Sequence, residues 1–396
     1  MGSAPGSGER CMRNAVIAII VGLVVGIAVG VSVVSPRLEL ASDDGTNLST
    51  PAVQERRPAG ESISNIVLAP EPAENAAVRW KLASAYSARL PQLGTLAKRL
   101  ETKIWQVSGG TMEIRFHEPG TLVPTDQIFD AVASGAIDSA FASPASLTGK
   151  SSAFGLFSAV PFGPTAGEYL AWLEFGGGRA LMESLYRQHN IHAVACGLLA
   201  PEASGWFRKE IRVADDLKGL RMRITGLGGR VMEKMGATTV VMDGGKIFMS
   251  LEAGTLDAAE FSMPAIDRVL GLERLAKYYY LPGWHQPATV FPLIINLDQW
   301  EKLEAIQKAR VEVVCGDNLR YGLAEGEALQ FDALKAIQAK GVQVRRWPRP
   351  ILEALKRAWR DVVGEETLAE ADFRRAWKSL AAFREDYAIW RELGYP

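Results

Sequence analysis

The stretch DLKGLRMRITGLGGRVMEKM at residues 216–235 decides the fold. Its apolar residues predict a short strand over Leu220–Ile224 that leads into a helix over Gly229–Met235. Strand-like and helix-like segments alternate in the same way through most of the chain from Val78 to Pro396. This order indicates an α/β fold with mostly parallel sheets. The other expected strands are Trp80–Tyr86, Met112–Phe116, Ile137–Ala142, His192–Leu198, Gly205–Ile211, Thr238–Met242, Asp257–Phe261, Val290–Asn296 and Val342–Trp347.

The composition excludes several classes of protein. The chain has 396 residues, of which 48% are hydrophobic and 22% are charged, so it can bury cores in two or three domains. Its formal net charge of −1 gives no basic excess to offset phosphate, and we expect no nucleic-acid partner. Three cysteines and four histidines are too few, and too scattered, for a disulfide-built scaffold, a cysteine cage or a paired zinc site.

The N-terminal region predicts export. Ala15–Val34 is a run of 20 residues without a charge, which as a helix would span roughly the 30 Å of a bilayer core. Arg10 and Arg13 precede it, so residues 1–14 are expected to form a cytoplasmic tail. The run is either an uncleaved transmembrane anchor or a cleaved signal segment. Residues 35–77 are rich in proline and polar side chains and are expected to be a flexible linker.

Two glycine-rich segments resemble nucleotide-binding motifs but lack required residues. Gly226-Leu227-Gly228 follows an expected strand, but Val231 stands where a dinucleotide motif needs its third glycine. Asp243-Gly244-Gly245-Lys246 is followed by Ile247 in place of the serine or threonine of a P-loop. There is also no G-x-S-x-G elbow. We therefore expect no organic cofactor and no enzymatic activity.

The residues of most interest stand at the ends of two expected strands. Arg223 ends one of them, and Glu260 with Phe261 ends another. Ligands of open α/β folds bind beyond the carboxyl ends of strands, where an arginine beside a glycine-rich helix start suits a carboxylate. Glu260 would then face the other end of the ligand or share a cation with it. A purely structural ion pair between Arg223 and Glu260 is the simpler alternative.

A series of segments in a fixed order resembles the solute receptors of TRAP transporters, and within these the receptors for 2-oxo acids and related monocarboxylates. Each segment alone is a weak signal, but together they cover most of the chain after Trp80. They are SGG at 108–110, LVP at 122–124, FDAVASG at 129–135, AVPFG at 159–163, GWFRKEI at 205–211, DLKGLRMR at 216–223, GG at 244–245, LEAG at 251–254, DAAE at 257–260 and YYYLPGWH at 278–285.

The resemblance implies a two-lobe, periplasmic-binding-protein-like α/β fold with a hinge, which closes on a small organic acid. Lobe I would comprise residues 78–200 with 289–320. Lobe II would comprise 201–288 with 321–396, including the C-terminal helices. The acid would then be handed to a membrane permease. The receptor would be periplasmic, and the anchor segment would tether it to the inner membrane.

The resemblance also implies roles for individual residues. Arg223 takes the place of the arginine that grips the carboxylate. Glu260 and the backbone carbonyl of Phe261, which replaces a usual tryptophan, would hold a Na⁺ or Ca²⁺ that bridges to the ligand. Glu202 stands where the family usually has a glutamine, so it would contact ligand or metal, although a solvated loop acid is equally compatible with the sequence. An acid usual in the last strand is replaced by Pro292.

Two other functions remain open from the sequence. The expected anchor is compatible with a membrane-bound ligand sensor or adaptor that uses the same fold. An enzyme on this scaffold would need Glu260 as a general base, but no nucleophile or histidine–acid set accompanies it. A homodimer is possible, because related receptors pair through long helices and residues 299–340 are expected to be helical.

Overall fold

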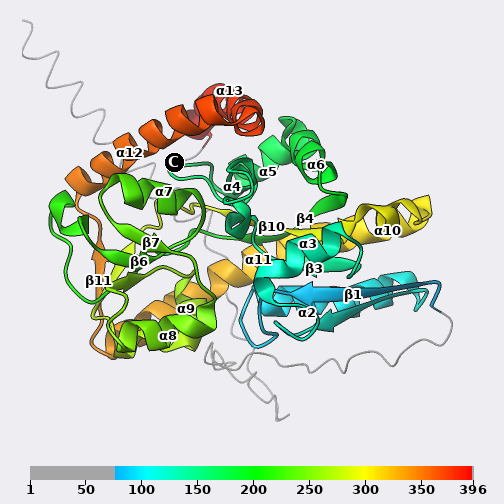
Figure 1. The fold of residues 1–396 in the computed structure, drawn as a ribbon, viewed down its shortest axis with the longest axis horizontal. Helices are drawn as coiled ribbons and strands as arrows, with labels where there is room; N and C mark the ends of the chain where they lie inside the picture. Colours follow the sequence, from blue (N-terminus) through cyan, green and yellow to red (C-terminus); the bar gives the residue numbers. More distant parts are fainter. Residues whose placement is uncertain (1–75, 395–396) are drawn as a thin grey trace, which may run out of the picture. The chain divides into compact units, whose positions relative to one another are not determined.

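The structure is a computed structural model that describes residues 76–394, and the account below is confined to them. A first sheet has five strands in the order β2-β1-β3-β10-β4 (Figure 1). A second sheet has six strands in the order β11-β9-β5-β8-β6-β7. The strands are β1 Val78–Ser84, β2 Met112–His117, β3 Ser139–Phe141, β4 Ile191–Leu199, β5 Gly205–Phe207, β6 Arg221–Arg223, β7 Thr238–Val240, β8 Ala258–Ala259, β9 Tyr278–Leu281, β10 Thr289–Asn296 and β11 Gln343–Arg346.

The α/β class is correct, but the sheets are mixed rather than mostly parallel. β10 runs antiparallel to both β3 and β4, and β5 runs antiparallel to both β8 and β9. Strands that follow each other in one sheet through a helical crossover are usually parallel, whereas β10 returns to the first sheet only after the chain has passed through the second. Several strands are also shorter than expected, above all β6 and β8.

Helices cover the sheets and link them (Figure 1). The long helix α11 packs against β4 and α2 of the first sheet's side and against α9 of the second sheet's side. The helices are α2 Gly94–Ser108, α3 Ile128–Ala133, α4 Ala153–Leu156, α5 Ala166–Phe175, α6 Gly178–Arg187, α7 Gly226–Lys234, α8 Gly244–Glu252, α9 Pro264–Leu270, α10 Leu297–Glu301, α11 Ala305–Ala339, α12 Arg349–Ala369 and α13 Ala371–Leu393.

The two C-terminal helices pack on different parts of the molecule. α12 lies against α7, which follows β6 of the second sheet. α13 instead packs against α4, α5 and α6, although residues 321–396 were expected together in the second lobe. The chain turns between them at Glu370, whose carboxylate accepts hydrogen bonds from the backbone and hydroxyl of Ser152 at 2.8 and 2.7 Å. The C-terminal segment therefore connects the two halves.

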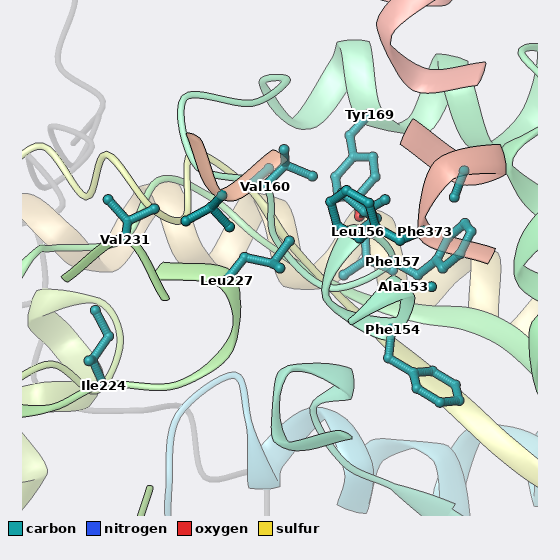
Figure 2. Packing of buried hydrophobic residues seen from close by; sticks show 14 of the residues in the cluster. Ala153, Phe154, Leu156, Phe157, Val160, Tyr169, Ile224, Leu227, Val231 and Phe373 are labelled. Carbon is teal, nitrogen blue, oxygen red and sulfur yellow. The ribbon is translucent and has the colours of Figure 1, made fainter. Parts of the chain in front are cut away.

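One buried apolar cluster joins these helices (Figure 2). Phe373 of α13 belongs to it together with Phe154 and Phe157 of the α4 segment. Leu227 of α7 also belongs to it, and it lies against Gly155, where an added Cβ would be only 2.7 Å from the Leu227 Cγ atom. Glycine at position 155 thus lets the first turn of α7 approach α4 closely.

A disulfide between Cys196 of β4 and Cys315 of α11 was not predicted. Both cysteines are buried, and 119 residues separate them in sequence. The signal was present, because two of the three cysteines follow the expected export segment and therefore occupy an oxidising compartment. The bond fixes the long helix α11 to the first sheet.

Replacing Cys196 and Cys315 together by alanine should lower the free energy of unfolding by about 2–4 kcal/mol, because the unfolded chain regains the freedom of a long closed loop. Urea denaturation followed by circular dichroism measures this change. Adding reductant to the native protein should lower the unfolding midpoint in the same direction. A double variant as stable as the parent would show that the bond contributes nothing to stability.

Within residues 76–394, no helix is both long enough and apolar enough to cross a membrane. The expected tail, the apolar run Ala15–Val34 and the linker up to residue 75 lie outside the described residues.

Candidate functional site

The ends of β6 and β8 place Arg223 and Glu260 side by side. The two strands are parallel neighbours, and Arg223 is in register with Ala259. The backbone N–H of Glu260 donates to the carbonyl of Arg223 at 2.8 Å. Because the carboxyl ends of parallel neighbours meet at one edge of a sheet, both side chains project from the same edge.

The guanidinium of Arg223 is buried, and two of its three nitrogens already donate hydrogen bonds to other residues of the protein. Its Nη1 donates to the backbone carbonyl of Glu260 at 2.6 Å and to Glu260 Oε2 at 3.0 Å, and its Nε donates to the Met242 carbonyl at 3.1 Å. The structural ion pair considered from the sequence is therefore present. Nη2 donates no hydrogen bond to any described residue, so this edge of the guanidinium remains for a ligand.

Two further features surround Arg223. The guanidinium carbon lies 5.3 Å from the centre of the Phe261 ring, a favourable cation–π distance. α7 begins at Gly226, three residues after Arg223, and directs the free N–H groups of its first turn toward this region. Thr225, at the N-cap position of α7, does not satisfy them with its side chain. These N–H groups can accompany Arg223 in binding an anion.

Glu202 is buried, with 2% of its surface exposed, so the solvated loop acid is excluded. Its Oε1 accepts a hydrogen bond from Thr289 Oγ1 at 2.5 Å, whereas its Oε2 has no partner among the described residues. Burial raises the pKa of Glu202 well above its usual range, and the nearby Glu260 carboxylate raises it further. The Thr289 hydroxyl, which donates to Glu202, and the nearby Ser262 hydroxyl, which makes no hydrogen bond of good geometry with it, lower this pKa but do not outweigh burial.

Three polar residues that the sequence did not single out for the site lie beside these two carboxylates. Ser262 follows Glu260 by two residues, and its buried hydroxyl has no hydrogen-bond partner in the described part of the chain. Gln286 and His285 follow the GW pair at 283–284, and the Gln286 Oε1 atom and both His285 ring nitrogens are likewise unpartnered. His285 Nε2 lies 3.5 Å from Glu260 Oε1. In the sequence, only their position at the end of, or just after, the segments DAAE and YYYLPGWH could have marked them as site residues.

The first sheet contributes Tyr86, which stands two residues after the end of β1. Its ring packs edge-on against Phe291 of β10 at 5.9 Å. Burial raises the pKa of its hydroxyl, while the positive charge of Arg223 lowers it and the charge of Glu202 raises it, so Tyr86 lies within electrostatic reach of these groups. A residue next to the first sheet therefore lies near the site at the edge of the second sheet.

Other positions of interest are structural. Trp206 and Trp284 are buried, and the Trp206 indole donates to Asp267 at 2.9 Å, in agreement with packing rather than ligand stacking. Pro292 lies at a register shift of β10, where a missing N–H does least harm. In the described residues, no three histidine, cysteine, aspartate or glutamate side chains come together to hold a metal ion.

Residues 82–368 match a family described as "Bacterial extracellular solute-binding protein, family 7". The chain belongs to this family. It is also 34% identical over 328 residues to a monocarboxylate 2-oxoacid-binding periplasmic protein of Nostoc sp., covering 80% of this chain and 88% of the relative. The resemblance to TRAP receptors is thereby confirmed, and the chain is an extracytoplasmic solute receptor.

Solved structures agree with the fold. A TRAP transporter solute-binding protein from Bordetella bronchiseptica, with copurified calcium and picolinate, has a TM-score of 0.79 and 33% identity, covering 81% of this chain and 95% of the other. A TRAP periplasmic solute-binding protein from Colwellia psychrerythraea, with bound calcium and pyruvate, has a TM-score of 0.77 and 30% identity, covering 80% and 97%. The two-lobe periplasmic-binding-protein fold is therefore correct for this chain.

Proposed function

We propose that this receptor binds a 2-oxo acid or a related small monocarboxylate between its two halves and delivers it to a TRAP permease. The observation that carries the proposal is the buried guanidinium of Arg223, whose Nη2 edge is free at the end of β6. Relatives that bind pyruvate, picolinate or 2-oxo acids support the ligand class. These ligands all combine one carboxylate with a small body, and a single available guanidinium edge suits one carboxylate.

The binding step follows from the geometry of Arg223. Met242 and Glu260 fix the guanidinium from two sides, so little conformational entropy remains to be lost when the ligand binds. Nη2 and the first N–H groups of α7 then donate to the ligand carboxylate. Tyr86 approaches from the first sheet, so closing the two halves would exclude water and strengthen these charged hydrogen bonds.

The residues beside Arg223 are suitable for a cation. Glu202 and Glu260 are both buried, and each carries one carboxylate oxygen that accepts no hydrogen bond from a described residue. Two buried carboxylates facing each other need a counter-charge beyond the one guanidinium that contacts Glu260. Glu202, Glu260 and the carbonyl of Phe261 would hold the ion. A bound Na⁺ or Ca²⁺ would neutralise the carboxylates and provide a positive charge for the ligand oxygens.

The anchor and the assembly belong to the same proposal. The run Ala15–Val34 would tether the receptor to the inner membrane, or would be removed after export. A homodimer is compatible with the long helix α11. We favour transport over a sensor because the similarities are to TRAP receptors. An enzyme is not favoured, because Glu260 accepts hydrogen bonds from Arg223 and no nucleophile accompanies it.

Native mass spectrometry of the full-length chain in detergent, together with titration calorimetry, tests this function. We expect a copurified acid, and binding of pyruvate or 2-oxobutanoate with a stoichiometry of one per chain. Dicarboxylates and sugars serve as negative controls. Failure to bind any monocarboxylate, with or without calcium, would contradict the proposal.

A hydrogen bond at the expected mouth of the site predicts an effect on ligand release. Thr125 follows β2 of the first sheet, and its hydroxyl donates to the Asp243 carboxylate at 3.2 Å. Asp243 occupies the N-cap position of α8, but its side chain does not cap that helix. Its backbone neighbour Met242 is held by Arg223. The contact thus links the first sheet's side to the loop that holds the guanidinium.

Replacing Thr125 by valine should speed ligand dissociation about 3- to 10-fold. The closed receptor then lacks one hydrogen bond to a charged group at a partly exposed site, so it should open more readily. The association rate should hardly change. Stopped-flow tryptophan fluorescence measures both rates. The neighbouring Asp126→Ala variant is the control and should release ligand at the parent rate. If Thr125→Val releases ligand at the same rate as Asp126→Ala, the contact between Thr125 and Asp243 does not help to retain the ligand.

A further inference from the structure

Four buried side-chain oxygens without a hydrogen-bond partner among the described residues lie on three segments that the backbone ties together. The N–H of Glu202 donates to the carbonyl of Gln286 at 3.1 Å, and the N–H of Ala203 donates to the carbonyl of Ser262 at 3.1 Å. The segments 202–203, 260–262 and 283–286 therefore meet at one place. The unpartnered oxygens are Glu202 Oε2, Glu260 Oε1, Ser262 Oγ and Gln286 Oε1.

Neighbouring contacts hold these side chains in place. Thr289 Oγ1 donates to Glu202 Oε1 at 2.5 Å and accepts from Gln286 Nε2 at 3.5 Å, which occupies the amide nitrogen and leaves the amide oxygen unused. Ser262 is held by its N–H, which donates to the buried Asp267 at 3.0 Å. Leaving a buried polar atom unpaired is unfavourable, so several such oxygens together indicate a partner that binds oxygen atoms.

We infer that Gln286 and Ser262 supply neutral oxygen ligands that complete, with the carboxylates of Glu202 and Glu260, a site that selects Ca²⁺ over Na⁺. The inference rests on the proposed function, which places a cation beside the ligand, and it assigns two residues and an ion preference to that cation. At the same distance, two carboxylates attract a divalent ion more strongly than a monovalent one. Calcium takes six to eight oxygen ligands, and amide and hydroxyl oxygens are among those it accepts.

The absence of a third acidic ligand strengthens the argument for neutral ligands. Within residues 76–394, no three histidine, cysteine, aspartate or glutamate side chains are arranged so that they alone could hold a metal ion. The Phe261 carbonyl and the ligand alone would leave the two carboxylates short of a calcium coordination shell. Gln286 and Ser262 are the neighbouring residues with buried, unused oxygens. The neighbouring His285 offers ring nitrogens that could act as metal ligands, and a nitrogen-based site would instead favour zinc.

Direct measurement of metal affinity tests the inference with the metal alone as the probe. The full-length chain in detergent is stripped with chelator and titrated calorimetrically with Ca²⁺, Na⁺ and Zn²⁺, without organic acid. We expect the parent to bind Ca²⁺ far more tightly than Na⁺. Gln286→Leu and Ser262→Ala should each weaken Ca²⁺ binding by about 10-fold or more, the scale on which metal sites respond to lost supporting groups. Gln286→Glu should retain or strengthen it.

The control is Gln338→Leu, which makes the same chemical change on the exposed end of α11 and should bind Ca²⁺ as the parent does. Thermal unfolding of each variant shows whether it is folded. If Gln286→Leu does not fold, the more conservative Gln286→Glu still tests the role of residue 286. Parent-like Ca²⁺ affinity in Gln286→Leu and Ser262→Ala, or a preference for Na⁺ or Zn²⁺, would overturn the inference. Pyruvate binding by the same variants would leave the proposed function intact.

Discussion

Replacing Arg223 by alanine should weaken binding of the cognate monocarboxylate by about 30-fold to several thousand-fold. Removing one partner of a buried charged contact costs about 2–5 kcal/mol, and 1.4 kcal/mol corresponds to a factor of ten. Arg223 is nearly fully buried, and the described residues provide no second guanidinium beside Glu260. Calorimetric titration with pyruvate or 2-oxobutanoate measures the loss directly.

The strand that carries Arg223 also supplies its control. Arg221 lies two residues earlier on β6, is exposed, and forms a two-point ion pair with Asp257 at 2.8 Å for each contact. Arg221→Ala removes the same side chain from the same strand and should leave ligand affinity within a factor of about two. If both variants bind as the parent does, Arg223 is only a structural partner of Glu260.

Loss of folding must be separated from loss of binding in this experiment. Arg223→Ala leaves the buried Glu260 carboxylate without its cation, so the variant should also unfold more easily. Arg223→Lys keeps the charge but loses the planar fork and cannot maintain the contacts to Met242 and Glu260 at once. We expect it to remain folded and to bind the acid with intermediate affinity. A lysine variant with unchanged affinity would show that charge alone suffices.

The sequence predicted the order of elements better than their directions and partners. Local periodicity marks a strand such as β10 wherever it occurs, and its eight residues are all buried as the apolar run indicated. Whether that strand runs parallel or antiparallel to β3 and β4 depends on contacts made across about 90 or more residues, which no local pattern records. The packing of α13 on α4–α6 escaped prediction for the same reason.

The site shows a similar division. Arg223 and Glu260 could be proposed because each ends a strand, and strand ends meet at one edge of a sheet. The burial of Glu202 could not, since an acid in a loop is exposed unless distant segments cover it, and here Gln286 and Thr289 do so. Ser262 and Gln286 have ordinary polar side chains. Only their unpaired oxygens in the folded chain distinguish them.

Removing the cation should weaken binding of the organic acid by more than about 10-fold. Without an ion, the bridging positive charge is lost and the Glu260 carboxylate beside Arg223 repels the incoming carboxylate. Pyruvate is titrated calorimetrically into chelator-treated protein and into the same sample with Ca²⁺ restored. The affinity should fall with chelator and recover with Ca²⁺, whereas Mg²⁺ should restore less because it demands a smaller octahedral shell.

A variant distinguishes charge repulsion from a direct role of the ion. Glu202→Gln removes one of the two buried carboxylates while keeping the side-chain shape and an oxygen near Thr289. If the ion serves only to cancel charge, this variant should bind pyruvate in the presence of chelator more tightly than the parent does at a pH above the raised pKa of Glu202. If the ion itself contacts the acid, chelator should weaken the variant and the parent alike, because the bridge is lost in both. Equal affinity of the parent with and without metal would remove Glu202, Glu260 and the Phe261 carbonyl from cation binding, and Arg223 would then hold the acid without a metal ion.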